Sequence, residues 1–470
     1  MVEKRIQNTA IDISPNANNA LEVEGVGEEI QLTEPENTSK GYEIIEEEDG
    51  GVTLDFDPNK KQSQGDYFAN IAEFMEDDLL DKLSSDLQKN FEDDKSSRSD
   101  WEKTYKDGLD LLGFKYEERS KPFAGAAGVT HPLLAEAVTQ FQAQAYKELL
   151  PPGGPVRTEI MGAPSLEVEQ QAERIKQFMN YQITCQMQEF DPELDQLLFH
   201  LPLAGSAFKK VYYDGTLERA VSKFVPAEDL VVPYFITDLE SCGRITHVVK
   251  MKHNDLRKNQ VSGFYRDVEL SPSTANPSDI KEKQDELSGV EQISFAEEEH
   301  NVLEMHVDLD LPGFEDMGVD NKKTGIMLPY IVTLDEDSGQ ILSIYRNWNQ
   351  GDPLRKKKEY FTHFKFLPGL GFYGFGLIHM LGGLSRTATA ALRQLVDAGT
   401  LSNLPAGFKA RGLRIRDDDE AINPGEWRDV DAPGGNLRES LMPLPYKEPS
   451  ATLFSLLGFV VDAGRRFAGV

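Results

Sequence analysis

The stretch that decides the fold runs from Gly369 to Ile415 and reads GLGFYGFGLIHMLGGLSRTATAALRQLVDAGTLSNLPAGFKARGLRI. It begins with glycine and aromatic residues, continues with a helical pattern and, after Pro405, becomes a short basic segment. In the middle part, apolar side chains recur every three or four residues, which places them on one helical face. These are Leu377, Leu381, Leu384, Ala388, Leu392 and Leu395. The pattern predicts a long helix with one narrow apolar face.

The other side of this helix carries small and polar residues. They are Gly382, Arg386, Thr389, Arg393, Asp397 and Thr400. Small residues let a neighbouring helix come close, so we expect the helix to pack as a shaft beside similar helices. Replacing Ala390 and Ala391 with Phe should then disturb that packing, because extra volume does not fit a close contact.

Length and charge limit the possible functions. The chain has 470 residues, which allows several domains, and its 49 basic and 80 acidic residues give a net charge of −31. Such a chain is not a general nucleic-acid binder, because affinity for phosphate comes mainly from Lys and Arg. Cys185 and Cys242 form neither a disulfide framework nor a metal cluster. The N-terminus lacks the apolar segment of a signal peptide.

The order of the sequence patterns predicts an α+β fold. Residues 1–65 are polar and acidic, and we expect them to be disordered. Helical patterns follow, one around Ile71 to Phe91, one starting at a cap on Ser99 or Asp100, and one after Pro132. Period-two alternation then predicts antiparallel strands, with a tight hairpin at Asp214-Gly215. The Ser- and Pro-rich stretch at 270–299 is expected to be a mobile loop.

Beyond the long helix, the segment GFKARGLRI (407–415) predicts a strand with a bulge at Gly412. Residues 416–448 are too rich in Pro and Gly for a long helix. Ser450 is expected to cap a final amphipathic helix. The apolar pattern of that helix still runs at Val470, so we expect the natural polypeptide to continue.

Two motifs suggest ligands, and we reject both. GLGFYG (369–374) matches the dinucleotide pattern, but aromatic side chains occupy its turn and no second strand ends in an acid downstream. DLDLPG (308–313) imitates a calcium loop but lacks the glutamate at its twelfth position. The histidines are scattered, and no hydrolase or nucleotide-triphosphate motif is present. We therefore expect no enzyme activity, cofactor, metal or small-molecule ligand.

The segment from Phe366 to Ser385 contains no Asp, Glu, Lys or Arg. Its length is close to that of a membrane span, although Pro368 and several glycines are poor helix formers. A membrane-inserting, pore-forming assembly that uses residues 366–385 is therefore the alternative hypothesis.

A local basic cluster contrasts with the acidic chain. It consists of Lys409, Arg411, Arg414 and Arg416. Charges of this kind protect a solvated strand edge, or they bind phosphate or an acidic partner protein. The sequence supports both readings equally.

Several segments, in the same order, are similar to one known family. KPFAGAAGVTHPLLAEAV (121–138), the segment VPAEDLVVPYFITDLESCGRITHVVKMK and its continuation (225–270), and residues 385–415 resemble portal proteins of tailed bacteriophages, of the podovirus type. These proteins are the head-to-tail connectors of the virion. The resemblance covers roughly residues 70 to 470. It consists of similar short sequence segments rather than catalytic motifs.

The resemblance implies a homo-oligomeric, dodecameric ring at one capsid vertex, through which double-stranded DNA is packaged and ejected. Residues 66–365 would form the wing, 366–402 an elbow and first stem helix, 403–448 the clip, and 449–470 the start of a second stem helix. Partners would be terminase, tail adaptor, capsid and scaffolding proteins. The subunit would be found in the virion and, during assembly, in the host cytoplasm.

The resemblance also assigns roles to the candidate residues. Arg386, Ala390, Arg393 and Asp397 of the stem would lie between subunits or face the channel. Lys409, Arg411, Arg414 and Arg416 of the clip would contact a docking partner or DNA phosphate. Because every neutralised phosphate adds affinity, a strongly acidic ring suits a channel that must let DNA slide.

Overall fold

The computed structural model describes residues 66–215, 217–270, 278–290, 299–317, 322–403 and 444–469, together with Met442 and the backbone of six short strands within 43–55 and 407–443. The chain divides into two compact units, Met1–Lys60 and Lys61–Val470. The finer division into wing, stem and clip stays a prediction.

The first unit contains one antiparallel hairpin. Strands β1 (Glu43–Glu46) and β2 (Val52–Asp55) pair with Glu43 opposite Asp55. This hairpin falls in the segment for which we expected disorder, and the remainder of residues 1–65 lies outside the described residues.

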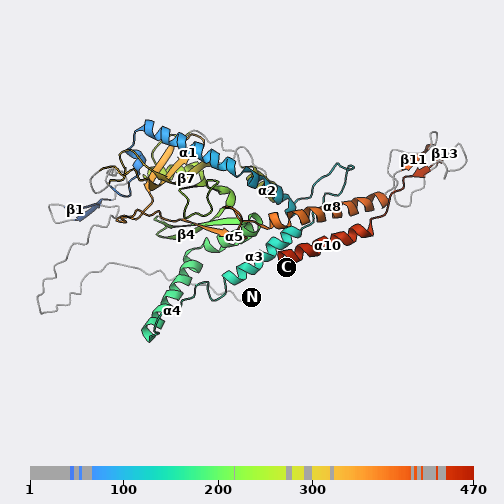
Figure 1. Ribbon diagram of the computed structural model, residues 1–470, viewed down its shortest axis with the longest axis horizontal. Helices are drawn as coiled ribbons and strands as arrows, with labels where there is room; N and C mark the ends of the chain where they lie inside the picture. Colours follow the sequence, from blue (N-terminus) through green and yellow to red (C-terminus); the bar gives the residue numbers. More distant parts are fainter. Residues whose placement is uncertain are drawn as a thin grey trace, which may run out of the picture. The chain divides into compact units, whose positions relative to one another are not determined.

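The second unit is α+β, as the sequence predicts, and begins with helices (Figure 1). They are α1 (Asp77–Ser97), α2 (Ser99–Leu109), α3 (Leu133–Leu149), α4 (Leu166–Tyr181) and α5 (Phe190–Ala204). Ile71 lies in a separate short turn, η1 (Ile71–Glu73), which the Asn70 side chain caps. The expected cap on α2 is wrong, because Arg98 precedes the helix and directs its side chain elsewhere.

A five-stranded antiparallel sheet carries one hydrophobic core. Its strand order is β5 (Leu230–Val231), β6 (Arg244–Lys252), β7 (Glu299–Leu309), β8 (Leu328–Asp335) and β9 (Ile341–Arg346). The apolar face of α1, including Leu80, Leu87 and Phe91, packs against Leu303 and Val332 of this sheet. Strands with alternating apolar residues present one such face, and an amphipathic helix covers it.

The second sheet has the order β10 (Phe361–Lys365), β3 (Ser206–Asp214) and β4 (Arg219–Pro226). The predicted hairpin between β3 and β4 is confirmed, but its loop is longer than a tight turn because Asp214 pairs with Arg219. An ion pair of 2.6 Å between Lys210 Nζ and the Glu304 carboxylate joins β3 to β7 of the larger sheet.

Helices α6 (His253–Val261) and α7 (Asp279–Ser288) lie in the connection between strands β6 and β7 of the larger sheet. The prediction of a mobile loop at 270–299 is wrong for its middle part, which forms α7. The Ser278 hydroxyl accepts a hydrogen bond from Lys281 N and caps this helix, and Ile280 is buried in the core that α7 shares with α2.

The long predicted helix is α8 (Leu377–Asn403), and α10 (Ala451–Ala468) packs beside it (Figure 1). The expected cap is confirmed, because Ser450 Oγ accepts a hydrogen bond from Leu453 N. Of the predicted apolar face, Leu377, Leu381 and Ala388 are fully buried, and the other three residues are half-buried.

The segment GFKARGLRI forms two strands, so the prediction of a single bulged strand is wrong. Strand β11 (Gly407–Lys409) pairs with β14 (Leu441–Pro443), and β12 (Arg414–Ile415) pairs with β13 (Val430–Asp431). The change of partner between Lys409 and Arg414 explains the shift in alternation that the sequence shows.

The glycine-rich elbow before α8 depends on close backbone contact. A Cβ on Gly374 would lie 2.5 Å from Gly205 O, and one on Gly376 would lie 2.4 Å from Leu203 O. Gly374 N donates to Ser206 Oγ (2.8 Å), and Phe366 N donates to Gly205 O (3.0 Å). None of the elbow glycines from Gly369 to Gly376 has a positive φ, so they permit close approach rather than an unusual bend.

We predict that Gly374→Ala lowers the free energy of unfolding by about 2 kcal/mol or more, because its methyl group would overlap a backbone oxygen. Gly371→Ala is the matched control, since a Cβ there meets nothing within 4 Å. Urea denaturation of both variants measures the difference, and equal stability of the two would refute the close-contact explanation.

Candidate functional site

Three polar residues on α8 bind the loop that joins α2 to α3. Thr389, Arg393 and Asp397 are four residues apart and lie on one side of the helix. Thr389 Oγ1 accepts a hydrogen bond from His131 N (3.0 Å), Arg393 Nε donates to Val129 O (2.7 Å), and Asp397 Oδ1 accepts from Ala127 N (2.7 Å). The side of α8 on which we expected a similar helix to pack therefore binds a loop of the same chain.

The bonds of Arg393 and Asp397 extend to the side chains of this loop. Arg393 also donates to Glu117 Oε2 (2.9 Å) and Thr130 Oγ1 (3.1 Å). Arg119 donates to Ala127 O (3.1 Å) and lies 3.9 Å from Asp397 Oδ2. Sequence reasoning singled out Arg393 and Asp397 but missed the loop, although the four-residue spacing of polar side chains was a signal that they share one target.

All four candidate residues of the stem line one hollow. It has a volume of about 450 Å³ and lies between α8 and the loop after α2. Its lining includes Arg386, Ala390, Arg393 and Asp397, together with Asp110, Glu117 and Arg119. The structure thus brings the four residues together. Whether they contact a second subunit or DNA stays a prediction.

Arg386 differs from the other charged residues of this hollow. Its side chain is exposed, and among the described residues it has no hydrogen-bond or ion-pair partner. Arg386 is thus an exposed cation at the edge of the hollow.

The four basic residues predicted for the clip are only partly described. Lys409 lies in β11 and Arg414 in β12, while Arg411 and Arg416 are outside the described residues. The choice between a protected strand edge and a binding surface is still open.

The aromatic residues of GLGFYG belong to the core. Phe372 is buried and stacks on Phe208 with ring centroids 5.8 Å apart, and Tyr373 stacks on Trp101 at 4.6 Å. Burial lowers the pKa of the neighbouring His363 to about 3, so its ring is neutral where it packs against Phe208 and Phe372. These contacts give the aromatic residues of GLGFYG a structural role in the core.

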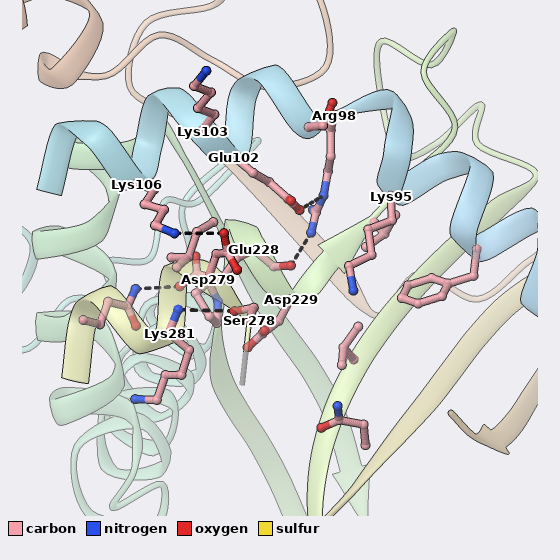
Figure 2. A pocket seen from close by; sticks show the side chains of 18 of the residues that line it. Lys95, Arg98, Glu102, Lys103, Lys106, Glu228, Asp229, Ser278, Asp279 and Lys281 are labelled. Carbon is pink, nitrogen blue, oxygen red and sulfur yellow. Dashed lines mark hydrogen bonds and ion pairs between the residues drawn. The ribbon is translucent and has the colours of Figure 1, made fainter. Parts of the chain in front are cut away.

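A second hollow, of about 860 Å³, lies where α1, α2, α7 and β6 meet the turn η4 (Ala227–Asp229) (Figure 2). Basic and acidic side chains alternate along its wall. Lys106 Nζ pairs with Asp279 at 2.8 Å, and Arg98 Nε pairs with Glu102 at 2.8 Å. These two ion pairs neutralise four of the charged residues that line the hollow.

Arg98 is the central residue of this second hollow. Its side chain is 6% exposed. The guanidinium donates to Ala227 O (3.1 Å), Leu230 O (2.8 Å) and Tyr373 Oη (3.0 Å), and to Glu228 O. It joins the α1–α2 junction to the turn before β5 and to the elbow. Sequence reasoning missed Arg98, because nothing near it in the sequence reveals acceptors so distant along the chain.

Asp229, in the turn that Arg98 binds, has a carboxyl group with a raised pKa. Burial, together with the neighbouring Glu228, raises its pKa to about 7, against the opposing effect of Lys250, Arg98 and Lys281. Half of the Asp229 side chains are therefore neutral near pH 7, which makes this hollow sensitive to pH.

No model of a known protein family matches this chain, and no curated protein matches it. Within the described part of the chain, no helix is both long and apolar enough to cross a membrane. Residues 366–376, the first part of the charge-free segment, precede α8 and are not helical. No group of three or more His, Cys, Asp or Glu among the described residues is arranged to hold a metal ion.

We predict that Asp229→Asn stabilises the protein at pH 8 by on the order of 2 kcal/mol and has little effect at pH 4. The sign follows because the pKa of Asp229 is higher in the folded state than its ordinary value of 3.8. Ionisation therefore disfavours the folded state, and wild-type stability falls as pH rises from 4 towards 7.

Thermal melts of both proteins at the two pH values measure this effect. Asp107→Asn is the control, because Asp107 lines the same hollow but is exposed. A stability difference for Asp229→Asn that does not depend on pH would contradict the prediction.

Proposed function

We propose that this chain is the subunit of a homo-oligomeric ring that forms the DNA portal of a tailed bacteriophage. One observation carries the proposal. Two adjacent helices, α8 and α10, are joined through a segment of short paired strands, and α10 exposes an apolar ridge that nothing in the described chain covers. This arrangement is what a stem of two helices with a clip between them requires.

The ridge on α10 has regular helical spacing. Leu456, Phe459 and Phe467 are 47%, 72% and 57% exposed, at intervals of three and eight residues. The ridge borders the buried side of the same helix, where Val460 and Gly464 are packed inward and Gly464 is close to Leu133. A soluble subunit rarely leaves such a row of large apolar side chains in water unless another protein covers it.

A ring explains how the ridge becomes covered. In a closed ring, one surface of each subunit meets a different surface of the next, so an exposed ridge on α10 needs a complementary face elsewhere on the chain. In a ring of identical copies, the ridge of every subunit is covered in the same way. The net charge of −31 supports a channel that does not hold DNA by phosphate contacts.

In this proposal, residues 66–365 form the wing, 366–402 the elbow and first stem helix, 403–448 the clip and 449–470 the second stem helix. The ring occupies the capsid vertex of the virion and lets double-stranded DNA enter and leave. The clip binds terminase and later the tail adaptor, and the wing contacts capsid and scaffolding protein. The similarity of segments 121–138, 225–270 and 385–415 to portal proteins supports these assignments.

We predict that wild-type protein forms rings with a central hole without detergent, as seen by negative-stain electron microscopy, and that Phe459→Asp abolishes them. A charge at the centre of the ridge would be trapped in an apolar contact. Phe235→Asp is the matched control, since Phe235 is 70% exposed but lies outside the stem. Rings of Phe459→Asp in wild-type yield would exclude the ridge as an interface.

A second pair of variants tests α8. Ala390 is exposed, whereas Ala391 is 5% exposed and packs inside the subunit, so the expectation that both face a neighbour is corrected for Ala391. We predict that Ala390→Phe reduces ring yield with an unchanged melting temperature, while Ala391→Phe destabilises the subunit by about 1–3 kcal/mol. Normal ring yield for Ala390→Phe would show that this side of α8 is not an interface.

A further inference from the structure

Among the described residues, the hollow beside α8 has one cation more than the acidic residues around it neutralise. Arg119, Arg386 and Arg393 line it, opposite Asp110, Glu117 and Asp397. Asp110 already pairs with Lys283 of α7 at 2.6 Å. Two acidic residues, Glu117 and Asp397, therefore remain for three arginines.

The other charges of the hollow are bound within the chain. Glu117 forms an ion pair with Arg393 at 2.9 Å. Asp397 accepts a hydrogen bond from Ala127 N and lies 3.9 Å from Arg119. Arg386 alone among these six charged residues has no partner in the described part of the chain. It is also exposed, so a group from outside can reach it.

We propose that this hollow receives a carboxylate side chain from a second copy of the chain and that Arg386 binds it. This inference rests on the proposed ring and names the chemistry of its contact at α8. A guanidinium presents a planar fork of N–H donors that matches both oxygens of a carboxylate. The walls of the hollow hold the partner side chain and reduce its exposure to water, which strengthens the pair.

The charges around Arg386 favour a protein carboxylate over DNA. A DNA backbone is a continuous row of anions, so it would meet Asp110, Glu117 and Asp397 as well as Arg386. A single carboxylate at the end of a protein side chain can reach Arg386 alone. A hollow of about 450 Å³ has room for side chains from a neighbouring subunit.

The chain itself supplies suitable partners. It has 80 acidic and 49 basic residues, so carboxylates exceed the cations available to pair with them. Several stand exposed on helix surfaces, for example Asp78, Asp81 and Asp86 on α1. A second copy in a ring would therefore bring unpaired carboxylates to its neighbour without any other molecule.

The test compares ring assembly of the full chain with Arg386→Glu and Arg386→Lys by mass photometry. Charge reversal should weaken subunit association roughly tenfold or more, because the carboxylate of the neighbour would meet a like charge. Lysine keeps the charge but loses the fork, so Arg386→Lys should retain part of the ring yield. Arg174→Glu is the matched control, an exposed arginine of helix α4 without a described partner.

Arg386 makes no hydrogen bond or ion pair within the described subunit, so the melting temperature of unassembled Arg386→Glu should equal that of the wild type. Wild-type ring yield for Arg386→Glu would overturn the inference and leave the proposed ring intact. Rings of Arg386→Glu that assemble normally but bind double-stranded DNA differently in a filter assay would assign Arg386 to DNA and also overturn it. Wild-type protein that forms no rings would instead refute the proposed function.

Discussion

The backbone contact between Gly205 and Gly374 sets the positions of the elements around it. The two segments touch so closely that neither position has space for a Cβ, and hydrogen bonds on both sides fix their alignment. Gly205 ends α5 and leads into β3, while Gly374 leads into α8. This single contact therefore decides where α8 leaves the sheet. The buried guanidinium of Arg98 strengthens it from the other side, because it binds Tyr373 of the elbow and the carbonyls before β5.

Helices α8 and α10 each have one side packed within the described chain and another side exposed. The side of α8 with Thr389, Arg393 and Asp397 holds the α2–α3 loop, so its polarity serves internal hydrogen bonds. Arg386 on α8 and the Phe459 ridge on α10 remain outside. An apolar ridge supplies most of the contact free energy in an assembly, and a single charged group adds orientation and specificity. In the proposed ring, the two features together would form the contact between subunits.

One acidic residue, Asp229, has an ionisation that depends on its local surroundings. In the second hollow Lys106 pairs with Asp279, whereas burial and the neighbouring Glu228 raise the pKa of Asp229. A carboxyl that is partly neutral near pH 7 weakens the junction of helices and sheet as pH rises. The turn that Arg98 binds is thus also a pH-sensitive part of the structure.

The sequence by itself determined the α+β class, the strands of the body, the long helix α8 and the cap of α10 at Ser450. These features follow from periodicity and capping, which depend on residues near one another in the chain. It could not determine α7, because a polar helix that buries only Ile280 leaves a weak apolar pattern. It also could not separate β11 from β12, since a change of strand partner is a property of the sheet.

For the candidate site, too, the sequence and the tertiary structure determine different features. Sequence reasoning selected Arg386, Ala390, Arg393 and Asp397, and the structure gathers them around one hollow. Only the tertiary structure decided which of them are already engaged, because the partners of Arg393 and Asp397 lie in a loop far away in the sequence. It likewise revealed that Gly374 and Gly376 of the elbow permit close packing against Gly205. Contacts between distant segments leave no periodic trace in a sequence, and they decide which side chains remain free to act.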